Sequence, residues 1–195
     1  LEATSLAVRD PINAATRAID FVYFPTAGMV SMVAALDDGS QVEVGIVGSE
    51  GVVGGTVLMG TNKASNEAFV QIAGSALRLR STILISRALE SRSLRDRLLL
   101  STLTLMSQIS QTAACNLRHN LVERLARWLL MSRERIKTND LPLTQESPPM
   151  MLGVRRAGVT AAPGTLQAAG LIRYTHGRIV VLDGHGLEAA ACECY

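Results

Sequence analysis

Apolar residues follow a short, interrupted pattern over the first 80 positions of the chain. The runs Phe21–Phe24 and Met29–Leu36 end at a proline and at an Asp-Asp-Gly turn, and Gln41–Val47 alternates between polar and apolar side chains. Two further runs, Ala68–Ile72 and Ala76–Leu79, are parted by a glycine. Many short runs bounded by turn residues are typical of strands, so this region is predicted to form an antiparallel β-sandwich, roll or barrel.

From about Leu94 the apolar residues recur in steps of three and four, which indicates a helix. The helix would run to about Arg135 and measure about 60 Å at a rise of about 1.5 Å per residue. With a gap at Ser110, its apolar stripe consists of Leu99, Leu103, Met106, Ala113, Leu117, Leu121, Leu125 and Trp128.

A second apolar stripe, made of Leu98, Leu105 and Ile109, lies on a neighbouring face and widens the apolar surface of this helix. A small β-domain does not cover so broad a surface. We therefore expect a partner helix, most simply from a second copy of the chain. The alternative is a long helix that folds back on its own domain.

Turn and helix signals organise the last third of the chain. Thr144 can cap a helix that starts near Gln145, and a second helix is expected over Arg155–Ala169. Strands are predicted at 171–174 and 178–182, joined by a tight hairpin. Helix, turn, helix and hairpin is the order of a winged helix-turn-helix, whose second helix enters the major groove of DNA.

These elements predict an α+β chain in three parts: a β-domain over 1–93, a dimerisation helix over 94–136 and, after a linker at 137–140, a winged helix-turn-helix over 140–195. The net charge of +2 is divided unevenly between them. Residues 1–93 carry seven basic and nine acidic side chains, whereas 94–195 carry twelve and eight. A basic second half favours a module that faces nucleic acid, although solvated arginines on a long helix explain it equally well.

The composition narrows the class of protein. With 195 residues, of which 48% are hydrophobic and 18% charged, the chain is long and apolar enough for a substantial core. The longest uncharged stretch, Leu98–Leu117, contains nine polar side chains, which argues against a membrane span. No signal peptide is visible, so we expect a cytoplasmic protein. Leu1 is not an initiator methionine, so the natural start is expected to be missing.

The cysteines and histidines suggest no metal, cofactor or catalytic site. Three cysteines are too few for a disulfide scaffold or a four-ligand zinc set, and they are interpreted as reduced thiols. Cys115 is expected to be a small buried residue on the helix, and the three histidines lack metal-type spacing. A cupin-like enzyme would need histidine ligands in the β-domain, but 1–93 contains none. We therefore do not expect an enzyme.

Several short motifs are spread along the chain in a fixed order. They are Phe24–Gly28, Val42–Gly45 and Gly48–Gly51, then Arg124–Leu130, Leu143-Thr144, Leu152–Arg156, Leu166–Ile172 and Gly177–Ile179. Together these motifs resemble the Crp/Fnr family of bacterial transcription regulators. The resemblance covers essentially the whole chain and implies a cyclic-nucleotide-binding-like β-roll, a long dimerisation helix and a winged helix-turn-helix. Family members have a helical segment before the first strand, and this chain is expected to begin after it.

The resemblance also implies roles in DNA binding. Arg156 matches the arginine that commonly reads a guanine, because its planar group makes two bonds to that base. The other candidates would contact phosphates, bases or the minor groove, from the two helices and from the wing. They are Arg155, Thr160, Thr144, Gln145, Arg173, His176 and Arg178.

Three prolines disagree with the family pattern. Pro148 and Pro149 fall in the expected first helix, and Pro163 falls inside the recognition helix. Each removes a backbone donor, at a cost of about 3 kcal/mol or more inside a helix. Two alternatives remain: a kinked but working motif, or a degenerate member that dimerises, retains a ligand site and binds DNA weakly or not at all.

The resemblance further indicates where an effector would bind. Glu50 and Gly51 lie near the family's ribose-binding element, whereas Asn66 stands where the phosphate-binding arginine would fall. Cyclic AMP is therefore not expected to bind through the usual residues. Glu50, Gly51 and Asn66 are weak candidates for contacts to another small effector. The predicted partners are double-stranded DNA, a second copy of the chain, that effector and, as a further candidate, RNA polymerase, in a homodimeric regulator of a palindromic operator.

Overall fold

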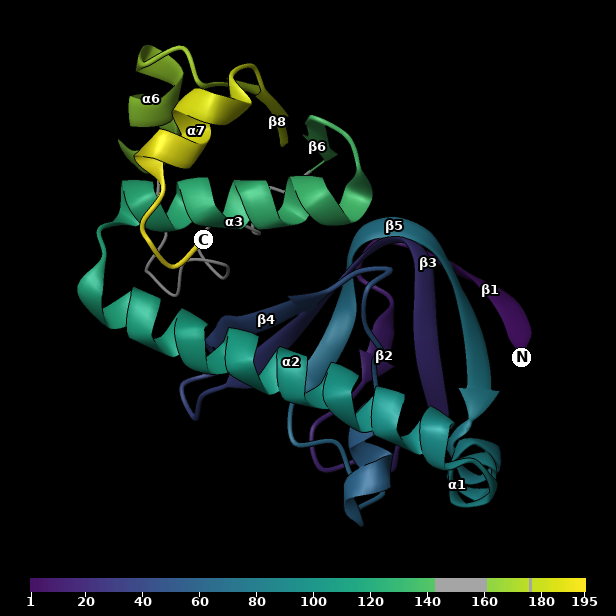
Figure 1. Ribbon diagram of the computed structural model, residues 1–195. Helices are drawn as coiled ribbons and strands as arrows, with labels where there is room; N and C mark the ends of the chain where they lie inside the picture. Colours follow the sequence, from purple (N-terminus) through teal and green to yellow (C-terminus); the bar gives the residue numbers. More distant parts are fainter. Residues whose placement is uncertain (143–160, 176) are drawn as a thin grey trace.

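The computed structural model describes residues 1–142, 161–175 and 177–195. A curved antiparallel sheet packs against the long helix α2, and a smaller C-terminal unit sits above it on α3 (Figure 1). The N-terminal part contains β1 (Glu2–Leu6), β2 (Pro11–Asn13), β3 (Phe21–Ala35), β4 (Gln41–Val47), the 3-10 helix η1 (Gly55–Met59) and β5 (Glu67–Arg80). Three helices follow: α1 (Ser81–Glu90), α2 (Arg92–Arg118) and α3 (Leu121–Ile136). The C-terminal unit adds β6 (Asp140–Pro142), α6 (Ala161–Ala168), β7 (Ile172–Thr175), β8 (Arg178–Val181) and α7 (Gly184–Ala190).

The predicted antiparallel β-domain is confirmed. Its strands follow the order β1-β5-β3-β4, and β2 pairs with β5. The predicted turn between β3 and β4 is present, with Gly39 at a φ of +79° and its N–H donating to the Leu36 carbonyl at 2.9 Å. Positive φ is the conformation that glycine adopts without strain, so this position explains the Asp-Asp-Gly sequence.

Two predicted strand breaks are wrong. The runs over 21–24 and 29–36 form the single strand β3, and those over 68–72 and 76–79 form the single strand β5. Pro25 remains in the ladder opposite Ala76, where the register shifts on its C-terminal side. A bulge tolerates a proline because one residue there is left without ladder partners.

Gly28 and Gly74 allow these two long strands to bend together. Gly28 has a φ of +81°, and a Cβ built on it would lie 2.5 Å from the Ile72 carbonyl oxygen. A Cβ on Gly74 would overlap the Ala27 carbonyl group. The roll therefore depends on a backbone approach that excludes any side chain at these two positions.

The predicted continuous helix over 94–136 is wrong. The helix α2 ends at Arg118, His119 is extended with φ −112° and ψ 150°, and α3 begins after Asn120. The Asn120 side chain accepts hydrogen bonds from the backbone N–H groups of Val122 and Glu123, and the Glu123 carboxylate accepts from the Asn120 N–H. This reciprocal pair is a capping box, which satisfies the first donors of a new helix.

The helix α3 lies at the centre of the largest apolar core. Leu125 and Trp128, which the sequence pattern places in one stripe with Leu117, are buried in that core, whereas Leu117 is exposed. The core joins the C-terminal unit to the roll. Besides α3, it contains Leu141, Leu166, Ile172, Ile179, Val181 and Leu187 from the C-terminal unit, and Met29, Ile46 and Ile72 from the roll.

The C-terminal unit contains the predicted wing. Strands β7 and β8 pair in an antiparallel hairpin that includes Gly177, whose φ is +80°. Residues 137–139 of the predicted linker connect α3 to the wing, whereas Asp140 already belongs to β6, which pairs with β8. Within the described residues, no helix combines the length and the apolar character needed to cross a membrane.

Replacing Gly74 with alanine is expected to destabilise the fold. The new Cβ would meet backbone atoms of Ala27, which cannot rotate away as a side chain can. We expect Gly74→Ala to lower the free energy of unfolding by about 2 kcal/mol or more, measured by urea denaturation. Gly164→Ala is the matched control, because nothing lies within 4 Å of its Cβ position in α6. This control should leave stability unchanged or raise it, and an equal loss in both variants would contradict the steric explanation.

Candidate nucleic-acid interface and the buried junction behind it

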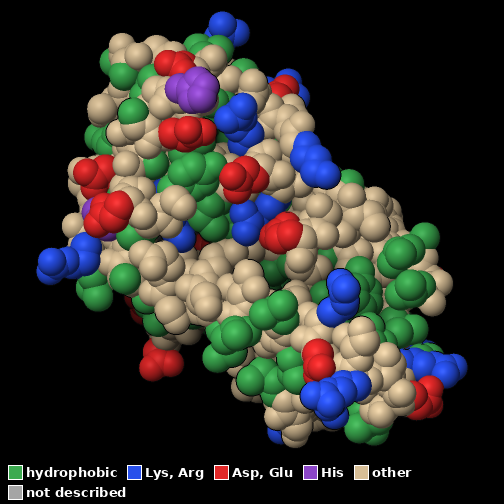
Figure 2. Space-filling model, in the orientation of Figure 1, with side chains coloured by type: hydrophobic (Ala, Val, Ile, Leu, Met, Phe, Trp, Pro, Cys, Tyr) green, Lys and Arg blue, Asp and Glu red, His purple; other side chains and the backbone are tan. Residues whose placement is uncertain are grey.

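The wing presents two arginines on one exposed face. Arg173 pairs with Val180 and Thr175 with Arg178, so all four side chains share one side of the hairpin. Both arginines are exposed, whereas Ile172 and other residues on the opposite face pack into the core. The Arg178 Nε lies 2.9 Å from the Asp140 carboxylate of β6. Basic and acidic side chains are interspersed over this unit on the face in Figure 2, so that face does not present a continuous basic patch.

The helix α6 leads directly into the wing. Pro163 lies within α6, and its side chain is buried, as are those of Ala162 and Leu166. The helix is followed by Gly170, whose φ of +75° and N–H bond to the Gln167 carbonyl close its last turn. The Gln167 side chain accepts a hydrogen bond from the Tyr174 N–H at 2.7 Å. This bond joins the helix to the first strand of the wing and fixes the angle between them.

The other predicted DNA-binding residues lie outside the described residues, as do two of the three prolines. Their roles stay predictions. These positions are Thr144, Gln145, Pro148, Pro149, Arg155, Arg156, Thr160 and His176.

A buried carboxyl group joins the roll to α3. Glu43 on β4 accepts hydrogen bonds from the Trp128 indole Nε1–H at 2.6 Å and from the Ser31 hydroxyl at 2.5 Å. Burial raises the pKa of Glu43 to about 7, although both hydrogen bonds and the Arg135 charge act in the opposite direction. The alternation of polar and apolar side chains along β4 predicts that Glu43 lies on the polar face of the strand. A bulge at Val44 disrupts the alternation, because Met32 pairs with Gly45 and Val33 with Glu43.

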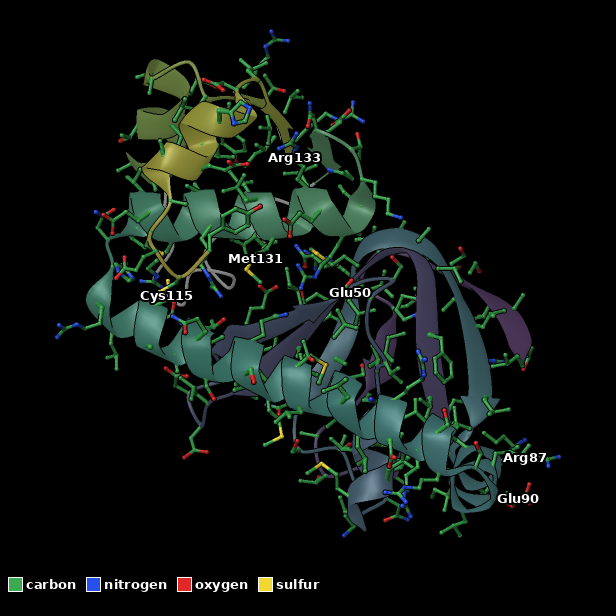
Figure 3. All side chains as sticks on the ribbon, viewed as in Figure 1. Glu50, Arg87, Glu90, Cys115, Met131 and Arg133 are labelled. Carbon is green, nitrogen blue, oxygen red and sulfur yellow. The ribbon has the colours of Figure 1, made fainter. Side chains whose placement is uncertain are left out.

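A second contact joins the loop after β4 to the end of α3. The Arg135 Nε lies 2.8 Å from the Glu50 carboxylate, which also accepts from the Gly48 N–H at 3.1 Å. Figure 3 shows Glu50 below the C-terminal part of α3 and Met131 in the same space, whereas Arg133 points to the other side of the helix. Glu50 is therefore part of the junction between the roll and the C-terminal unit.

The three candidate effector residues do not form one site. Asn66 lines a narrow cleft between the roll and α2, with a cavity volume of about 30 Å³, together with Gly54, Gly55 and Thr102. Glu50 and Gly51 are absent from that cleft's lining, and Glu50 instead pairs with Arg135. Of the three candidates, only Asn66 lines this cleft, which has room for about two water molecules and would have to widen to admit an effector.

The structure gathers the cysteines, which the sequence did not predict. Cys115 and His119 at the end of α2 meet Cys192 and Cys194 of the C-terminal tail, and one donor atom from each lies within 4.8 Å of the others. Burial, followed by the neighbouring Cys192 thiol, raises the pKa of Cys115 to about 12. Without a cation this thiol stays protonated and is a poor nucleophile. We call these four residues the Cys3His cluster.

Comparison with known proteins identifies the C-terminal unit. Residues 123–190 match the model of the Crp-like helix-turn-helix domain. No curated protein matches the sequence.

Solved structures extend the likeness to the whole chain. FixK2 from Bradyrhizobium japonicum is 18% identical with a TM-score of 0.83, covering 98% of this chain and 97% of its own. TTHB099, a CRP-family transcriptional regulator from Thermus thermophilus, is 19% identical with a TM-score of 0.80, covering 98% and 100%. TTHA1359, a CRP/FNR-family regulator from the same organism, is 22% identical with a TM-score of 0.79, covering 97% and 98%. At these identities the likeness establishes the fold.

The Glu43 carboxyl is expected to make stability depend on pH. Its folded pKa of about 7 exceeds the ordinary value of 4.5, so the folded chain holds a proton that the unfolded chain releases between these values. The proton therefore contributes to the free energy of unfolding. This contribution, on the order of 3 kcal/mol, is fully present below pH 4.5 and is lost as pH rises through about 7.

Glu43→Gln should remove this dependence, because its amide can donate to Ser31 and still accept from Trp128. Urea denaturation across this pH window would measure it, with Glu90→Gln, an exposed carboxyl on α1, as the control. Equal pH slopes for wild type and Glu43→Gln would refute the assignment.

Proposed function

Because the chain has the fold of Crp/Fnr regulators and carries a Crp-like helix-turn-helix domain, we propose that it is a transcription regulator that binds double-stranded DNA as a homodimer. The observation that carries this proposal is the register of the wing, which supports contact with DNA through Arg173 and Arg178. A guanidinium group can donate two parallel hydrogen bonds to one phosphate. Such contacts fix the orientation of a helix-turn-helix on the duplex. The predicted base contact of Arg156 belongs to the same proposal.

The exposed face of α2 supports the homodimer. Gln108 bonds both backbone groups of Ile46, accepting from its N–H at 2.7 Å and donating to its carbonyl at 3.2 Å. These bonds hold one face of α2 on the edge of β4 and turn the opposite face to solvent. On the view in Figure 2, hydrophobic side chains gather over the part of the molecule where Figure 1 places α2 and α1. The exposed positions at heptad spacing are Leu99, Leu103, Met106, Ser110, Ala113 and Leu117.

A stripe with alternating steps of four and three is the seam of a two-stranded coiled coil. An apolar seam of this length needs a cover in water, and a second α2 from an identical chain provides one of matching length. The same two-fold axis would present two wings and two recognition helices to half-sites about one helical turn of DNA apart. A palindromic operator follows from this symmetry.

The cleft behind α2 supports control by a small molecule. It is lined by residues of the roll, including Asn66, and by Thr102 and Leu105 of α2. A small molecule that widened this cleft would contact the dimerisation helix directly and shift the population of its packing arrangements. Asn66 offers no positive charge to a phosphate, so cyclic AMP is not the proposed effector. RNA polymerase remains a candidate partner of the DNA-bound dimer.

Removing a wing arginine should weaken DNA binding on every sequence. We expect Arg173→Ala to reduce affinity for random and selected duplexes alike and to lower the salt slope by about 1, because a phosphate contact is lost. Fluorescence anisotropy titrations at several salt concentrations would measure both effects. Arg87→Ala is the control, since Arg87 lies on α1 and pairs with Glu90 at the far end of the molecule (Figure 3). Wild-type protein that binds no duplex would instead favour the degenerate family member.

A charge in the seam should separate the proposed dimer. Leu103 is 57% exposed in the single chain, so Leu103→Glu leaves the fold intact but places two like charges against each other in the seam. Sedimentation equilibrium should give the mass of one chain, 20.8 kDa, for this variant and twice that mass for wild type. Leu89→Glu changes an even more exposed leucine on α1, outside the seam, and should remain dimeric. A wild-type monomer at micromolar concentration would refute the dimer.

A further inference from the structure

The Cys3His cluster brings donors together from two distant parts of the chain. Cys115 lies in the last turn of α2, and His119 follows the helix, with its N–H donating to the Cys115 carbonyl at 3.1 Å. Cys192 and Cys194 follow α7, where the tail descends past α3 toward α2 (Figure 1). Figure 3 places Cys115 at the end of α2 nearest to α3.

Two of the distances within the Cys3His cluster are those expected between ligands of one ion, and all four donor atoms lie within 4.8 Å of one another. The Sγ atoms of Cys115 and Cys192 are 3.5 Å apart, and the Cys194 Sγ is 3.6 Å from the His119 Nδ1. A tetrahedral ion with bonds of about 2.3 Å to sulfur and about 2.0 Å to nitrogen separates its ligands by about 3.4–3.8 Å. Three thiolates and an imidazole form one of the usual ligand sets of structural zinc.

The imidazole of His119 is held in the orientation that a metal ligand requires. Its Nε2 lies 3.1 Å from the Glu193 carboxylate, while its Nδ1 faces the Cys194 sulfur. A proton on Nε2 shared with a carboxylate leaves the lone pair of Nδ1 directed into the cluster. Carboxylate–histidine–metal arrangements of this kind fix the tautomer of the ligand and raise its basicity.

Neighbouring polar groups support a negatively charged centre. The Gln111 side-chain N–H donates to the Cys194 sulfur at 2.9 Å, and the largely buried Arg127 donates to the Cys194 carbonyl at 3.0 Å. The Arg127 charge also acts on Cys115. A divalent ion with three thiolates and a neutral imidazole carries a net charge of −1, which one guanidinium balances.

We propose that the Cys3His cluster binds a single tetrahedral divalent cation of the zinc type. The ion displaces the three thiol protons to solvent and takes four protein ligands, so no position remains open for catalysis and the site is structural. It would tie the C-terminal tail to the end of α2, next to the Asn120 cap. A two-iron cluster would need its ligands divided between two metal centres, whereas these four donor atoms all lie within 4.8 Å of one another.

The full chain, purified with a thiol reductant and then freed of metal by a chelator, is titrated with Zn²⁺ and with Co²⁺. We expect one ion per chain, the intense visible absorption of tetrahedral Co²⁺–thiolate coordination, and a higher melting temperature with Zn²⁺ than without it. Cys192→Ser and His119→Ala should lose the tight site. His185→Ala is the matched control, because the His185 side chain is fully exposed on α7 and should leave the titration unchanged.

Glu193→Gln tests the same site without removing a ligand. The Glu193 side chain is 83% exposed, so this variant should fold normally but bind Zn²⁺ about 10–100-fold more weakly in competition with a chromophoric chelator. Uptake of less than one ion by reduced wild type, or full uptake by Cys192→Ser, would overturn the proposal. Iron and inorganic sulfide in equal amounts in the purified protein would overturn it as well, in favour of an iron–sulfur centre.

Discussion

The hydrogen bond from the Trp128 indole to the buried Glu43 carboxyl fixes α3 against the roll. Both partners are buried, so breaking the bond would leave the indole N–H and one carboxyl oxygen without a hydrogen-bond partner and out of reach of water. Because α3 is also the centre of the core that holds the wing, α6 and α7, its position sets the position of the whole C-terminal unit. The ion pair between Arg135 and Glu50 supports the same contact further along α3.

Local patterns were sufficient to predict the parts of the fold that depend on neighbouring residues. The wing follows from two short apolar runs around a glycine, and the turn before β4 follows from Asp-Asp-Gly. The exposed seam of α2 was visible in the spacing from Leu99 to Leu117. The family resemblance then assigned these elements to one overall fold, with a β-roll followed by a long helix and a winged helix-turn-helix.

Features that a stronger pattern concealed, or that depend on distant contacts, were missed. The sequence Asn120-x-x-Glu123 carries the capping signal, but the apolar stripe continues through it and concealed the break. The strand β3 passes Pro25 only because bulges against β5 absorb the mismatch. No local pattern reveals that the C-terminal tail, more than 70 residues after Cys115, reaches the end of α2. Glu43 was likewise assigned to a polar face because the bulge beside it was not foreseen.

The extended residue between α2 and α3 has a mechanical consequence. A continuous helix carries twist along its ladder of hydrogen bonds, but this ladder is interrupted at His119. Rotation of α2 about its own axis therefore reaches α3 only through side chains that span the interruption, since these are the remaining rigid connections. The angle between α2 and α3 is therefore held by packing, hydrogen bonds and the contacts of the cysteine thiols, and not by a continuous helix backbone.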